Sequence, residues 1–207
     1  MELEAFIGES EAVDRTLADV PDDAWQRPAL GVWNLAELVA HLARGAGRVH
    51  AYLDQDPGGD APACDRVGYY RLGTGPEEAR AVAQRARELA AATRPGDLPG
   101  AFADAWRRSA ARAADLPPDR LIATIHGPMH LGEYVATRVL ETTVHHLDVL
   151  RALERPPVAT PAAGRLTMAL LEGLLGDRRP RNFGRMRFIL AATGRLEVDD
   201  PRMPVLQ

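Results

Sequence analysis

The chain has 207 residues, 46% of them hydrophobic, which is enough to bury one sizeable core. Its formal net charge is −4, so the composition gives no indication of nucleic-acid binding as a main function. The sequence has no apolar run near the roughly 20 residues that cross a membrane, and its N-terminus lacks the pattern of a signal peptide. A lone cysteine, Cys64, cannot form an internal disulfide, so we expect a protein of the reducing cytoplasm.

Apolar residues at helical spacing, separated by loops rich in Gly and Pro, predict a mainly α fold. The expected helices cover residues 3–19, 35–54, 74–93, 101–115 and 130–153. The fourth of these can also be read as the third helix continuing after a kink. A loop at 21–31, a polar connection from 56 to about 73 and a short β-like run at 121–125 join them.

Capping residues support two of these helix starts. Asn34 has the N-cap position, and Glu37 three residues later completes a capping-box pattern. Thr74, followed by Pro76 and Glu77, is the expected N-cap of the third helix.

The last fifty residues predict a smaller unit. Thr160 and Pro161 begin a helix over 161–175, and Gly176 ends it. Residues 186–190 (Met-Arg-Phe-Ile-Leu) alternate like a strand. We therefore expect a helix bundle over 1–155 and a small helix–strand extension over 156–207, which packs on the bundle as an α/β unit.

The most informative motif is the run from Arg138 to Asp148 in the fifth expected helix. Glu141 and His145 are four residues apart, which puts them about 40° apart around the axis and about 6 Å apart along it. One carboxylate and one imidazole on a single helix face can bind the same ion. An ordinary Glu–His pair on an amphipathic helix explains the same spacing.

A second motif precedes it by a hundred residues. In the helix that starts after Asn34, His41 falls beside the apolar stripe of Leu35, Leu38 and Leu42. A histidine there needs a polar partner, because an unpaired buried polar group costs about 1–3 kcal/mol. Taken alone, His41 also fits a core histidine with an ordinary hydrogen bond. If the two helices are neighbours, however, His41, Glu141 and His145 can converge as a catalytic type of zinc site, with one position open for water.

Two neighbours of the motif have alternative roles. Asp148 lies on the same face and can accept a hydrogen bond from a metal-binding histidine, or form an ion pair with an arginine of another helix. Arg138 lies one turn before Glu141. We expect it to form a structural ion pair with that carboxylate, with contact to an anionic substrate as the alternative.

The remaining histidines are not expected to bind the same ion, although His130 could line the pocket and His126, in a turn, could reach its mouth or lie at the surface. His146 is rotated about 100° from His145 and should point to a neighbouring helix or to solvent. His50 should face away from His41, at the surface. His130 lies about 16 Å before Glu141 along the axis, too far to share an ion with it.

The order Trp33-x-x-x-Glu37-Leu-x-x-His41-Leu, then Arg138-x-x-Glu141-x-x-x-His145-x-x-Asp148, resembles the mycothiol-dependent maleylpyruvate isomerase family. That family belongs to the DinB-like superfamily of metal-binding four-helix bundles. The resemblance spans most of residues 1–155 and includes Ala-Ala-Thr-Gly-Arg at 191–195. All 25 basic residues are Arg, which with abundant Ala indicates a GC-rich genome such as that of an actinobacterium, where mycothiol is the usual small thiol.

The resemblance implies a divalent metal, usually zinc, bound by His41, Glu141 and His145, and mycothiol as thiol cosubstrate. The expected activity is that of a metal-dependent thiol S-transferase or isomerase. A metal-bound thiolate would attack a small electrophilic, anionic substrate. The short C-terminal portion differs from the longer tails of the isomerases, so the substrate need not be maleylpyruvate.

Arg195, in the family-like Thr-Gly-Arg turn, is the expected substrate-binding arginine, and Trp33 and Tyr134 are expected pocket walls with core packing as the alternative. The protein is expected to be a monomer or homodimer. Three other functions fit the same residues: a metal-dependent hydrolase, a thiol-independent rearrangement enzyme, and a non-catalytic binding or stress-response bundle.

Overall fold

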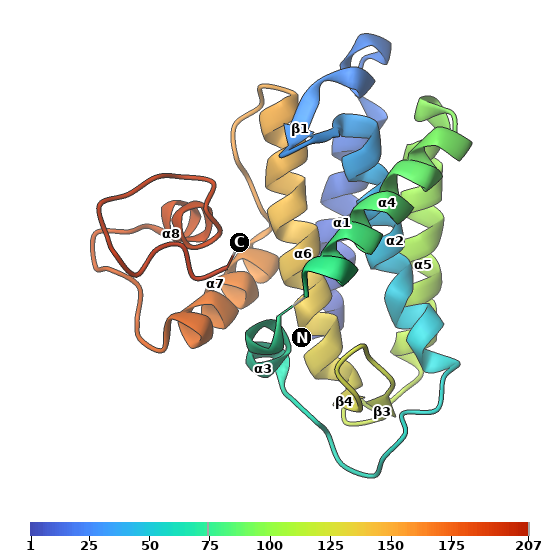
Figure 1. Ribbon diagram of the computed structural model, residues 1–207, viewed down its shortest axis with the longest axis vertical. Coiled ribbons are helices and arrows are strands. Elements are labelled where there is room, and N and C mark those ends of the chain that lie inside the picture. The colour runs from blue at the N-terminus through green and yellow to red at the C-terminus, as the bar shows by residue number, and fades with distance from the viewer. Residues whose placement is uncertain (74, 207) are drawn as a thin grey trace.

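The computed structural model describes residues 1–73 and 75–206 and confirms a mainly α fold built on a helix bundle (Figure 1). The α-helices of this part are α1 (Glu2–Ala18), α2 (Leu35–Leu53), α3 (Arg66–Leu72), α4 (Pro76–Ala92), α5 (Leu98–Ala114), α6 (Leu131–Ala152), α7 (Pro161–Leu175) and α8 (Arg185–Ala192).

Four long helices form the bundle. Helix α1 packs on α5 and α6, and α2 packs on the same two helices, so each member has two neighbours around a common core. Helix α4 crosses the outside of the bundle against α2 (Figure 1). The helix of His41, α2, and the helix of Glu141 and His145, α6, are direct neighbours, which the sequence alone left open.

Local sequence explains where the key helices begin and end. The Asn34 side chain accepts a hydrogen bond from the Glu37 backbone N–H, and the Glu37 carboxylate accepts one from Asn34 N–H, so the predicted capping box forms. Gly176 ends α7 in the left-handed conformation, with φ of 71°, which glycine adopts without steric cost.

The connections between the helices contain short strands and 3₁₀ turns. Strands β1 (Pro28–Leu30) and β2 (Trp33–Asn34) form a hairpin before α2, preceded by a 3₁₀ turn at Asp22–Gln26. The expected β-like run is shorter than predicted: β3 (Leu121–Ile122) pairs with β4 (Met129–His130) and leads into α6.

Two sequence expectations need correction. The polar connection after α2 contains helix α3, capped by Asp65, whose side chain accepts from the backbone N–H groups of Val67 and Gly68. The helix expected at 101–115 is confirmed as a separate helix, α5, which is preceded by a 3₁₀ turn at Pro95–Asp97 and does not continue α4. The run 186–190 lies in α8, so the tail is helical and not α/β. Thr74, the expected N-cap of α4, lies outside the described residues.

The buried apolar side chains form two clusters. The larger fills the bundle and includes Phe6, Leu38 and Phe102. The smaller joins Leu140 and Leu147 of α6 to the buried side chains of α7, α8 and the tail. The strand predicted for residues 186–190 was wrong because two adjacent residues, Phe188 and Ile189, are both buried in this cluster. A strand with one buried face would bury only every second residue, whereas a helix can bury two in a row. No described helix is long and apolar enough to cross a membrane.

Candidate metal centre

The contact between α2 and α6 brings the three predicted ligands together. One potential ligand atom from each of His41, Glu141 and His145 lies within 4.8 Å of the other two. His145 Nε2 is 3.5 Å from Glu141 Oε2, and the rings of His41 and His145 meet edge to face with centroids 4.9 Å apart. Two of the donors come from one turn of α6 and the third from α2.

A buried carboxylate fixes the orientation of His145. Its Nδ1 donates to Asp148 Oδ2 at 3.1 Å, which directs Nε2 toward Glu141 and His41. The guanidinium of Arg195 in turn donates to both Asp148 oxygens, at 3.1 and 2.7 Å. Asp148 therefore accepts from His145 and also pairs with an arginine, which comes from the segment after α8 and not from a neighbouring helix as expected. Burial alone would raise the pKa of Asp148, but the hydrogen bonds from His145 and Arg195 lower it.

The protonation states suit a cation site. Burial, with the nearby charge of His145, lowers the pKa of His41 to about 3, so its imidazole is neutral at pH 7. Burial would raise the pKa of Glu141, yet the hydrogen bond from His145 and the charge of Arg138 hold it well below its usual value. Burial opposes charge on His145 as well, but its bonds to Asp148 and Glu141 raise its pKa.

This donor set fits a divalent metal. Two imidazoles and one carboxylate are the ligands of many catalytic zinc sites, and a carboxylate behind one imidazole is the usual support for such a ligand. A cation bound there would compete with a proton for His145, whose pKa Asp148 and Glu141 raise.

A residue missed by the sequence interpretation supports Glu141. The Tyr70 hydroxyl lies 3.1 Å from Glu141 Oε1 and 3.0 Å from the Thr137 carbonyl oxygen. Tyr70 belongs to α3, in the segment expected to be a polar connection. The N-cap at Asp65 and the glycine at position 73, which has φ of 67°, were the local signals for this short helix.

The expected ion pair between Arg138 and Glu141 is absent from the salt bridges of the described residues, so that expectation was wrong. The Arg138 guanidinium carbon instead lies 5.0 Å from the Tyr134 ring centroid and 5.8 Å from that of Tyr69. Long side chains of a helix point back toward its N-terminus, which brings Arg138 over Tyr134, one turn earlier.

His41, Glu141 and His145, called the triad below, line a cavity of about 710 Å³. Its walls come mainly from α2, α3, α4 and α6, with Arg195, Val205 and Leu206 from the tail. Trp33 and Tyr134, the predicted wall residues, both line it, and the Trp33 ring lies 4.9 Å from the ring of His41. Arg195 lines it too, although its guanidinium is occupied by Asp148 and the Thr193 carbonyl oxygen.

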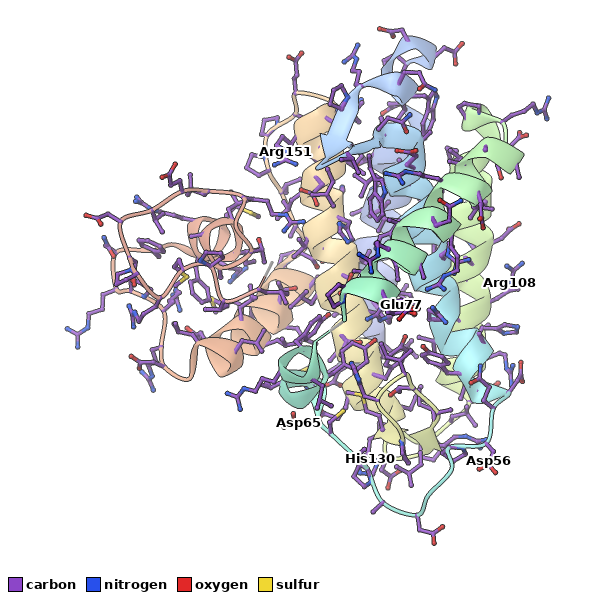
Figure 2. The ribbon with its side chains drawn as sticks, in the orientation of Figure 1. Asp56, Asp65, Glu77, Arg108, His130 and Arg151 are labelled. Atoms are coloured by element: carbon purple, nitrogen blue, oxygen red, sulfur yellow. The ribbon has the colours of Figure 1, made fainter. Side chains whose placement is uncertain are left out.

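Three of the other histidines lie away from the triad, whereas His126 packs edge to face on Tyr69, with ring centroids 4.9 Å apart. His146 points from α6 to α1, where its Nδ1 is 2.8 Å from Glu9 Oε1 and its Nε2 is 2.9 Å from Thr16 Oγ1. His130 bonds the Asp119 carbonyl oxygen at the start of α6, the opposite end of the helix from Arg151 (Figure 2). His50 is only partly exposed, contrary to the surface expectation, because α5 packs against this part of α2.

Fold and cavity together define a helix-bundle protein with a cavity beside the contact of α2 and α6. The family model of the mycothiol maleylpyruvate isomerase N-terminal domain matches residues 8–150. The chain therefore belongs to the mycothiol maleylpyruvate isomerase family and is an enzyme of the isomerase kind.

Solved structures agree with this fold. The crystal structure of the mycothiol-dependent maleylpyruvate isomerase superposes with a TM-score of 0.57 at 16% identity, covering 84% of this chain and 68% of that one. A mutant of the same isomerase gives the same values. No curated protein matches the sequence.

Proposed function

We propose that this protein is a metal-dependent thiol S-transferase or isomerase that uses mycothiol on a small, electrophilic and anionic substrate. His41, Glu141 and His145 are the proposed ligands of a divalent metal, with zinc as the metal. We also propose that the protein is cytoplasmic and comes from an actinobacterium. Its proposed partner is a small-molecule substrate, and the protein is proposed to be a monomer or homodimer.

The observation that carries the proposal is the convergence of three ligand atoms within 4.8 Å at the wall of a cavity large enough for a small substrate and part of a thiol. A structural zinc site is closed by four protein ligands, whereas a three-ligand site leaves a position for a reactant. Membership of a family named for a mycothiol-dependent reaction supports a thiol as that reactant.

A divalent metal held there would lower the pKa of a bound thiol, so that the thiol would bind as thiolate at neutral pH. The protein contributes orientation. Asp148 holds the His145 ring through Nδ1, and Tyr70 donates to the Glu141 carboxylate. These contacts fix the ligands before a reactant arrives, which reduces the reorganisation that the reaction requires.

The substrate would occupy the cavity beside the triad. Trp33 and Tyr134 are its proposed apolar walls, and Arg195 is proposed at its tail side, where it also holds Asp148 in place. The division into a bundle over 1–155 and an extension over 156–207 is likewise proposed. Two separate buried clusters support it, with α6 belonging to both.

The test is a thiol-dependence assay on the zinc-reconstituted protein. Mycothiol is incubated with 1-chloro-2,4-dinitrobenzene or with maleylpyruvate, and the loss of free thiol or the isomerised product is measured. We expect turnover that requires both zinc and thiol and is lost in His145→Ala. The His130→Ala variant, altered at the far end of α6, is the matched control and should retain turnover.

Two results would contradict the proposal. Product formation that proceeds equally without thiol would identify a hydrolase or rearrangement enzyme on the same site. Turnover that persists at full rate in chelator-treated protein, or in His145→Ala, would remove the metal from the mechanism.

A further inference from the structure

The cavity has a second polar region, separate from the triad. Arg138 and Tyr134 precede Glu141 on α6 by one and two turns, so their backbone positions lie about 5 and about 10 Å from it along the helix axis. Both side chains line the same cavity as the triad. A ligand with an atom at the triad can therefore reach this region without leaving the pocket.

Arg138 is a buried cation held by aromatic rings. The residue is only 7% exposed, and its guanidinium lies over the rings of Tyr134 and Tyr69. In the described part of the chain its one hydrogen bond runs from Nε to Thr137 Oγ1, at 3.1 Å, and no carboxylate lies within ion-pair distance. Its terminal nitrogens are thus left for the cavity.

The aromatic groups that contact Arg138 add hydroxyl donors and no carboxylate. Tyr52, Tyr69 and Tyr134 form a ring cluster, with centroid distances of 5.2 Å for Tyr52–Tyr134 and 5.9 Å for Tyr69–Tyr134. Among the described residues, none of the three hydroxyls has a hydrogen-bond partner. Arg48 lies over the Tyr52 ring at 5.4 Å.

The carboxylates of the cavity wall are used elsewhere. Glu141 belongs to the triad, and Glu78 pairs with Arg85. An ionised group taken out of water needs a partner, because its desolvation costs several kcal/mol. Among the described residues, neither wall carboxylate lies within ion-pair distance of Arg138, although the charges of Glu141 and Arg138 act on each other. The fitting direct partner is therefore an anion that arrives with the ligand.

We propose that Arg138 and the surrounding tyrosine hydroxyls bind a carboxylate of the substrate, which makes Arg138 a specificity-determining residue. The planar guanidinium fork matches two carboxylate oxygens, and the rings hold it in place. The inference rests on the proposed function, in which the same substrate reacts at the triad. It specifies a small acid whose carboxylate lies about one to two helical turns, roughly 5–10 Å, from the reacting atom.

The test uses cinnamate as a carboxylate probe and cinnamamide as its neutral counterpart. Binding is measured by ligand-observed NMR on protein freed of metal, with no thiol present. We expect cinnamate to bind the wild-type protein and its affinity to fall about tenfold or more in Arg138→Met, since a charge-assisted hydrogen bond is lost. Arg138→Lys should lie between the two, and cinnamamide should bind poorly to all.

Arg187→Met is the matched control, because Arg187 also lies over an aromatic ring, that of Phe183 at 4.7 Å, but outside the cavity. It should bind cinnamate as the wild type does. If Arg138→Met does not fold, Tyr134→Phe removes only a hydroxyl and should weaken cinnamate binding a few fold.

Equal affinity of Arg138→Met and wild type would overturn the inference, as would equal binding of cinnamamide, or binding that appears only after zinc is added. In the folded Tyr134→Phe variant, unchanged affinity would count against it. Because the assay contains neither metal nor thiol, its result is independent of whether the thiol reaction occurs.

Discussion

His145 and His146 are adjacent in α6, both are buried, and both contact a carboxylate, yet they have opposite surroundings. His146 faces α1 and uses both ring nitrogens, one with Glu9 and one with Thr16. His145 faces α2 and uses only Nδ1 in a short hydrogen bond, with Asp148, while Nε2 points to Glu141 at 3.5 Å at the cavity wall.

The difference shows why His145, and not His146, is the candidate metal ligand. Burial and a carboxylate partner are common to both. A ligand needs a second nitrogen that faces open space with other donors beside it. On the α1 side the pair of His146 and Glu9 has no such nitrogen or oxygen left over, because the second oxygen of Glu9 accepts a hydrogen bond from the Thr160 backbone N–H.

Removing the contact of His146 with α1 should give the largest change in the free energy of unfolding. His146→Ala leaves the Glu9 carboxylate buried without its ring partner, which should lower the free energy of unfolding by about 3–5 kcal/mol. Chemical denaturation of the metal-free protein measures this. Metal content per folded chain should stay at the wild-type level, because His146 faces away from the triad.

The Glu9→Gln variant sharpens this prediction. Since His146 and Glu9 contact each other, the double variant should cost less than the sum of the two single changes. Additive costs would mean that the pair does not interact as described.

Removing the carboxylate that supports His145 should weaken metal binding. Asp148→Asn removes the charge that orients His145 and pairs with Arg195, so we expect a 10- to 100-fold loss in metal affinity by the general behaviour of such supporting groups. Competition with a chromogenic chelator measures it. An affinity equal to that of the wild type would show that His145 needs no support from Asp148.

The two histidines proposed as metal ligands, His41 and His145, should differ in the pH dependence of their metal binding. His145 has a raised pKa, so a proton competes with the metal as the pH falls through that value, whereas His41, with a pKa of about 3, is already neutral. Zinc affinity should therefore fall about tenfold for each pH unit below the pKa of His145. A hundredfold fall per unit would mean that both rings are protonated in the metal-free protein.

Much of this site could be predicted because its signals are local. The four-residue spacing of Glu141 and His145 and the Asn34–Glu37 capping box each depend on one helical turn. That α2 neighbours α6 depended on the family resemblance. The surroundings of Arg138 depend on tertiary contacts: the Tyr69 ring comes from α3, and no residue near Arg138 in the sequence indicates that α3 packs there.

Tyr70 provides the smallest expected effect. Tyr70→Phe removes a hydrogen bond that the Tyr70 hydroxyl divides between the Glu141 carboxylate and the Thr137 carbonyl oxygen, and that acts on the metal only through Glu141. Zinc affinity should therefore fall about a few fold, with the fold retained. The chelator competition measures this as well. A loss as large as that in Asp148→Asn would mean that α3 controls the site more than α6 does.

The most direct test of the central claim is elemental analysis of protein purified without chelator and reconstituted with zinc. We predict about one zinc per chain in the wild type and in His146→Ala, and almost none in folded His145→Ala, with circular dichroism as the check on folding. Equal zinc in His145→Ala and wild type, or none in any of the three, would contradict a metal centre formed by His41, Glu141 and His145.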